Sequence, residues 1–122
     1  MRRGGWSAVL VLILAQAVAH IAIGAEPGAV ADAAMNGDLP LMYALLRSGA
    51  DVNARGSFGT PPLHWRVRVD DLEAVKRLLK AGADPNGLTE RGISPLSLAI
   101  ANGNSQMVGL LLRAGEIGRA HV

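Results

Sequence analysis

The sequence predicts an all-α fold, a solenoid of about three helix-turn-helix units. The first observation is a recurring segment in which a leucine pair, a cation, a small residue and a glycine occupy residues 45–49, 78–82 and 111–115. Its glycines, Gly49, Gly82 and Gly115, recur at a constant interval of 33, and a fixed period of this size is typical of stacked repeats. The second observation is composition, because 50% of the residues are hydrophobic but only 3% are aromatic. A core of Leu, Val, Ile and Ala between small, closely packed helices is therefore expected.

The recurring segment predicts the end of a helix. The leucines close its buried face, the cation lies at the negative C-terminal end, and glycine takes the left-handed conformation that ends it. Ala-Asp-x-Asn follows at residues 50–53 and 83–86, and Asp and Asn favour turns. We expect equivalent helices to end at Gly49, Gly82 and Gly115, aligned along one row.

The segment over residues 1–25 has the pattern of a secretory signal peptide. Arg2 and Arg3 precede an apolar run over residues 8–23, and Gly24 and Ala25 precede Glu26. Cleavage is expected after Ala25, where small residues precede a polar one. The apolar run is also shorter than the ~20 residues that a membrane-spanning helix needs. The alternative is an uncleaved anchor that holds the domain outside the inner membrane. We expect a secreted protein, located in the bacterial periplasm.

The first unit, residues 29–58, contains Ala33-Ala34, Asn36-Gly37-Asp38 and the leucine pair, with Pro40 early in its second helix. The second unit, residues 59–91, begins with Gly59-Thr60-Pro61-Pro62-Leu63-His64. The third, residues 92–115, contains Ser94-Pro95-Leu96-Ser97, where serine is a good N-cap and proline suits the first helical position. Asn102-Gly103 is expected to end its first helix.

These segments resemble the ankyrin-repeat signature Thr-Pro-Leu-His, and the turns resemble its Gly-Ala-Asp-x-Asn. The resemblance covers residues 29–115 and implies stacked helix pairs whose turns project as fingers. It also implies that His64 bonds to backbone and fixes a turn. The function it implies is non-catalytic binding of another protein, with no cofactor.

The second unit departs from this pattern. Pro61 stands at the capping position, Arg66-Val67 replaces the usual pair of alanines, and Asp70 stands where glycine usually ends the first helix. A buried arginine is costly unless its head group reaches water, so we expect this helix to be shifted or splayed.

Charge and residue types exclude several functions. From Glu26 onward ten Lys/Arg face ten Asp/Glu with the signs interspersed, so no basic stripe predicts a nucleic-acid partner. There is no cysteine, and no second histidine lies at ligand spacing from His64, so no metal site is expected. Asp70, Asp71 and Glu73 form an acidic cluster that we interpret as helix capping rather than paired-carboxylate catalysis. No enzymatic reaction is predicted.

We expect a partner protein to bind a concave face formed by the finger tips, residues 54–58 and 87–91, and the first helix of each unit. Tryptophan and arginine dominate interface energetics, and a tip phenylalanine adds an apolar anchor. The candidate partner-binding residues are Arg55, Phe58, Trp65, Arg66, Arg68 and Arg91. Packing of Trp65 against the next repeat is an equal alternative. A second hypothesis for function is an immunity or inhibitor-type protein that occludes a toxin or an envelope enzyme.

Residues 116–122 follow Gly115 where Ala-Asp-x-Asn is expected, and they show none of the repeat pattern. We interpret them as a non-native tail on a C-terminally truncated chain, whose natural form carries further repeats.

Overall fold

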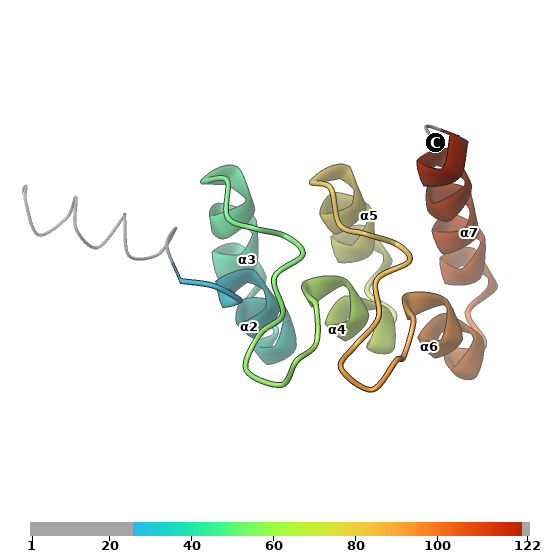
Figure 1. Ribbon diagram of the computed structural model, residues 1–122, viewed down its shortest axis with the longest axis horizontal. Coiled ribbons are helices and arrows are strands. Elements are labelled where there is room, and N and C mark those ends of the chain that lie inside the picture. Colours follow the sequence, from blue (N-terminus) through green and yellow to red (C-terminus); the bar gives the residue numbers. More distant parts are fainter. Residues whose placement is uncertain (1–25, 121–122) are drawn as a thin grey trace, which may run out of the picture.

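The computed structural model describes residues 26–120, and the side chains of residues 26–115. The helices in this range are α2 (Ala29–Asn36), α3 (Leu39–Arg47), α4 (Pro62–Arg68), α5 (Leu72–Lys80), α6 (Pro95–Asn102) and α7 (Ser105–Ala120). They form three pairs side by side, with the inner helices α2, α4 and α6 in one row and the outer helices α3, α5 and α7 in the other (Figure 1). Long finger loops follow α3 and α5, and no strand occurs between residues 26 and 120. The all-α repeat fold is confirmed, whereas the predicted signal peptide lies outside the described residues.

Side-chain caps begin most of these helices. Asp38, Asp71, Ser94 and Asn104 accept hydrogen bonds from backbone N–H groups three residues later at the starts of α3, α5, α6 and α7. Such a bond satisfies a donor that the helix itself leaves unpaired. Pro61 precedes α4 without a side-chain cap, as its place in the sequence predicts. Capping therefore accounts for Asp71, a member of the acidic cluster.

Left-handed residues end the inner helices. Gly37 and Gly103 follow α2 and α6 with φ of 74° and 72°, and Asp70 has φ of 58° at the equivalent place after α4. Gly49 and Gly82, with φ of 86° and 100°, follow α3 and α5 as predicted. The period seen in the sequence is therefore a structural repeat at these two outer helices.

The prediction that Gly115 ends the third outer helix is wrong, because α7 continues to Ala120. Glycine permits a left-handed exit but does not impose one. In the two finger loops a side chain fixes the exit, since Asp51 and Asp84 each accept a bond from the backbone N–H two residues on, at 2.9 Å. No aspartate follows Gly115 at that place, so nothing in the sequence turns the chain outward there.

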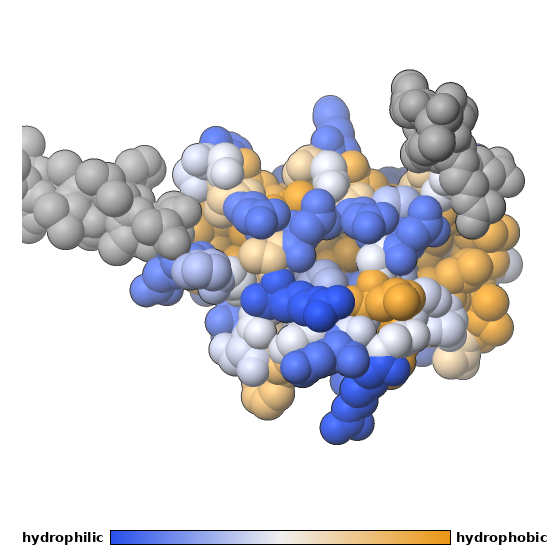
Figure 2. All heavy atoms as spheres, in the orientation of Figure 1, coloured by the Kyte–Doolittle hydropathy of each residue, from blue (hydrophilic) through white to orange (hydrophobic). Residues whose placement is uncertain are grey.

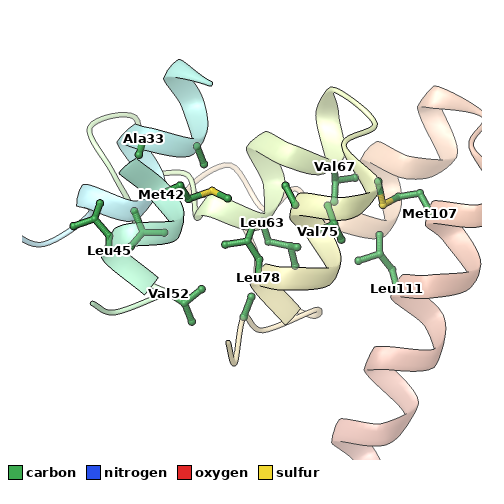
Figure 3. Close-up of a cluster of buried hydrophobic side chains, with 14 of the residues drawn as sticks. Ala33, Met42, Leu45, Val52, Leu63, Val67, Val75, Leu78, Met107 and Leu111 are labelled. Atoms are coloured by element: carbon green, nitrogen blue, oxygen red, sulfur yellow. The ribbon is translucent and has the colours of Figure 1, made fainter. Parts of the chain in front are cut away.

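The core runs through the stack between the two rows of helices (Figure 3). Its repeating element is the first leucine of each pair, since Leu45, Leu78 and Leu111 are 1%, 0% and 3% exposed. Burying a side chain of this size stabilises a fold by about 1.5–3 kcal/mol. The predicted core of Leu, Val and Ala is confirmed, but methionine takes the place expected for isoleucine: Met42 and Met107 are buried, whereas Ile93 and Ile100 are exposed.

Arg66 is buried at 8% exposure, in the place that Ala33 and Ala99 hold in the other repeats. Its Nη1 lies 3.2 Å from Asp71 Oδ2, and its Nε has no partner among the described residues. The helix is not shifted in register, because α2, α4 and α6 start at Ala29, Pro62 and Pro95, at equal intervals along the chain. The buried guanidinium is held by its ion pair with Asp71.

The signs are interspersed along the sequence as predicted, but the cations are concentrated on the outer helices. Within residues 26–115 the outer helices hold five cations and one acid. The inner helices and all connecting segments hold four cations and eight acids. The outer helices therefore carry a net positive charge, whereas seven of the eight remaining acids lie in the connecting segments.

Candidate protein-binding groove

The two finger loops are held to each other by hydrogen bonds. The Asn53 side chain donates from Nδ2 to the Gly82 carbonyl at 3.0 Å and accepts at Oδ1 from the Asp84 N–H at 2.8 Å. Further out, Arg55 Nη2 donates to the Leu88 carbonyl at 2.7 Å. These bonds join residues about one repeat apart, so each finger sets the position of the next.

The tip of the first finger is fixed on both sides. Asp32 of α2, in the same repeat, accepts bonds from the Ser57 N–H at 2.9 Å and the Ser57 hydroxyl at 3.0 Å. The Glu90 N–H of the following finger donates to the Gly59 carbonyl at 3.1 Å. Phe58 lies between the two bonded residues, Ser57 and Gly59, and its side chain is 67% exposed.

A groove of about 760 Å³ lies between the finger tips and the inner helices α4 and α6. In this groove the Phe58 ring meets the Trp65 ring edge to face, with 6.5 Å between centroids and 79° between planes. Figure 2 shows the finger side of the molecule, on which hydrophilic side chains cover much of the surface. The lining residues are Ser57, Phe58, Thr60, His64, Trp65, Arg68, Thr89, Glu90, Arg91, Ile93 and Leu98.

The groove brings together four of the six candidate residues, Phe58, Trp65, Arg68 and Arg91. The other two lie elsewhere. Arg55 is exposed on the first finger, where it bonds to the Leu88 carbonyl. The proposal of Arg66 as an exposed contact is wrong, because its side chain is buried against Asp71.

The sequence interpretation missed Thr60 and Ile93, which line the groove at equivalent places in the second and third repeats. They are one full period apart and directly precede the aligned segments at residues 61–64 and 94–97. The repeat alignment therefore held a usable signal for both. Trp65 packs against the core on one side and lines the groove on the other.

His64 lies at the buried floor of the groove. Its Nε2 is 3.0 Å from the Ile93 carbonyl oxygen, so it connects α4 to the second finger as the predicted structural role requires. Burial lowers the pKa of His64, because a charged imidazolium loses solvation there, and bonds to the backbone oppose the shift only in part. Within residues 26–120 no three His, Cys, Asp or Glu side chains gather where they could hold a metal ion.

A family model of ankyrin repeats in three copies matches residues 30–120, which include nearly all of the three helix pairs. The chain belongs to the ankyrin-repeat family. Ankyrin repeats are in general modules for protein–protein interaction and are non-catalytic. None of the curated proteins compared with this ankyrin-repeat chain matches it. Among the helices between residues 26 and 120, none has both the length and the apolar character needed to cross a bilayer.

Proposed function

We propose that this protein binds a partner protein through the groove between its finger tips and inner helices. The observation that carries the proposal is Phe58, a large apolar side chain that is 67% exposed on a loop tip held from both sides. An apolar side chain in this position gains little from folding, whereas covering it with a partner removes its surface from water.

The surroundings of Phe58 favour a protein as the ligand. Trp65 supplies a second aromatic surface, and Arg68 and Arg91 bring cations to the rim of the same groove. Neither arginine has an ion-pair partner among the described residues. Aromatic and arginine side chains around one hollow are the composition that interface hot spots favour.

Rigidity supports the same proposal. The bonds from Ser57 to Asp32 and from Arg55 to Leu88 fix the finger loops, which carry Phe58 and Arg91. A surface that is ordered before binding loses less conformational entropy on association.

The proposal is tested by affinity capture from an envelope extract with the protein and with the double variant Phe58→Ala/Arg68→Ala. We expect the variant to lose at least about 2 kcal/mol of binding free energy, roughly a 30-fold weaker Kd for the captured protein. Both side chains are exposed, so the urea midpoint should stay unchanged. A matched control is Arg47→Gln/Lys80→Gln on the outer helices, which should bind as the parent does. Equal capture by the groove variant and the parent would contradict the proposal.

We place this interaction in the bacterial periplasm. The support is the charged and apolar pattern of residues 1–25, and mass spectrometry of the mature protein should then find Glu26 as its first residue. An intact N-terminus in the membrane fraction would favour the anchored form. If the captured partner is a toxin or an envelope enzyme whose activity falls on binding, the function is inhibition.

A further inference from the structure

The outer helices carry most of the positive charge of a chain that is neutral from Glu26 onward. Within residues 39–47, 72–80 and 105–115 the five cations and one acid give a formal net charge of +4. The remaining residues of the range 26–115 give −4. All five cations are exposed, and they are Arg47, Lys76, Arg77, Lys80 and Arg113.

The repeat sets the spacing of these cations. Arg47, Lys80 and Arg113 occupy the same place in successive repeats, so each outer helix presents one of them. The outer helices form a single row in Figure 1, and the three charges therefore extend across the described stack. Lys76 and Arg77 add to the middle of this array.

Three of the cations converge on a shallow hollow of about 500 Å³ between α3 and α5. Arg47, Arg77 and Lys80 line it. Arg77 is held over the ring of Tyr43, 4.3 Å from its centroid, and its Nε is 3.6 Å from Glu73 Oε1. One acid near three cations leaves the hollow positively charged.

We propose that this outer-helix face binds the surface of a membrane that contains anionic phospholipids. A row of exposed cations can contact several phosphodiester groups of one surface, and each Lys or Arg near such a surface adds to the attraction. The bound protein would therefore turn its finger groove away from the membrane, although the proposal does not depend on what the groove binds.

A small soluble phosphate fits this face less well. The hollow lies at the C-terminal ends of α3 and α5, where carbonyl oxygens carry partial negative charge close to the site. An anion in contact with the hollow meets these carbonyl oxygens, whereas an extended surface interacts with the summed charge at longer range.

Nucleic acid also fits less well. Single-stranded nucleic acid is bound by aromatic stacking as well as by charge, and Arg77 already covers Tyr43, the aromatic residue of the described outer helices.

The test is flotation of the full chain with vesicles of phosphatidylcholine alone and of phosphatidylcholine mixed equally with phosphatidylglycerol. The variant Arg47→Gln/Lys80→Gln should bind the mixed vesicles about tenfold more weakly than the parent, with binding to phosphatidylcholine unchanged. The control Arg68→Gln/Arg91→Gln removes the same charge from the groove side and should bind as the parent does. All four side chains are exposed, and the N-terminal segment is the same in every variant.

An equal loss of binding to the mixed vesicles in the two variants would show that net charge alone attracts the protein, and it would overturn the proposal. Two further outcomes would overturn it in favour of another ligand. The first is displacement from the vesicles by inorganic phosphate but not by sodium chloride of equal ionic strength. The second is binding of duplex DNA that matches binding to the mixed vesicles and shows the same dependence on Arg47 and Lys80.

Discussion

Arg66 is the residue at which the second repeat differs most from its neighbours. The first and third repeats have alanine at this place, whereas Arg66 fills it with a charged side chain that meets Asp71. Asp71 also caps α5, so one carboxylate serves two partners. Its side chain is 24% exposed, which places the pair at the edge of the core.

These contacts predict unequal effects for the two members of the pair. Arg66→Met replaces a desolvated charge by an apolar chain of similar length and should change the free energy of unfolding by less than about 1 kcal/mol. Asp71→Ala removes the cap and leaves the buried guanidinium unpaired, so a loss of about 2–3 kcal/mol is expected. Urea denaturation measures both values, and equal losses would contradict this assignment of roles.

His64 predicts that stability depends on pH. Its pKa is lowered from 6.5 in the folded state by burial, so the unfolded chain takes up a proton first as the pH falls. The stability that the neutral His64 contributes is complete above the unfolded value and decreases as the pH falls from there toward the folded pKa. Urea midpoints measured from about pH 7.5 down to about pH 5.5 should therefore decline. The decline should be smaller in His64→Gln, because this variant lacks the contribution of His64. Some decline can remain, since the other histidines titrate in both proteins. A parallel decline in the variant would contradict the assignment.

At the scale of the elements, the finger loops depend on one asparagine that reaches the next repeat. Asn53 bonds to both Gly82 and Asp84, whereas Asn86, at the same place one repeat later, makes no such side-chain bond to the described residues. Asn53→Ala should lower the free energy of unfolding by about 1–2 kcal/mol, and Asn86→Ala by less than about 0.5 kcal/mol. Thermal or urea unfolding of the two variants measures both losses, and each variant is the control for the other. A larger loss in Asn86→Ala would contradict the proposed role of Asn53.

The helices that could be predicted from the sequence are those whose ends are set by nearby residues. Ser94 and Gly103 bound α6 through a side-chain cap and a left-handed turn, both of which depend on local sequence. The end of α7 could not be predicted from Gly115 alone, since the turn requires the residues after it. The burial of Arg66 was missed for a different reason, because its ion pair with Asp71 forms only after the chain turns between α4 and α5.

The candidate site was predictable where the repeat alignment alone sets the position of a residue. The repeat alignment places Phe58 and Arg91 at equivalent finger tips, and both line the groove. The edge-to-face contact of Phe58 with Trp65 depends on how the finger folds over α4, which no local pattern encodes.

At the scale of the whole molecule, stacking creates two surfaces that the linear sequence hides. The constant repeat period puts equivalent side chains in rows, so cations that are separated in sequence gather on the outer helices. The same stacking brings the two finger tips and the inner helices around one groove. The neutral overall balance of charge therefore conceals a molecule with two different faces.

Photo-crosslinking in the native cells tests the central claim that the groove is the protein-binding face. A photoreactive amino acid placed at Phe58 reports on the groove, and the same amino acid at the exposed Ala44 reports on the outer helices. The account predicts a discrete protein adduct from position 58 and none from position 44. Protein adducts from position 44 alone would contradict it.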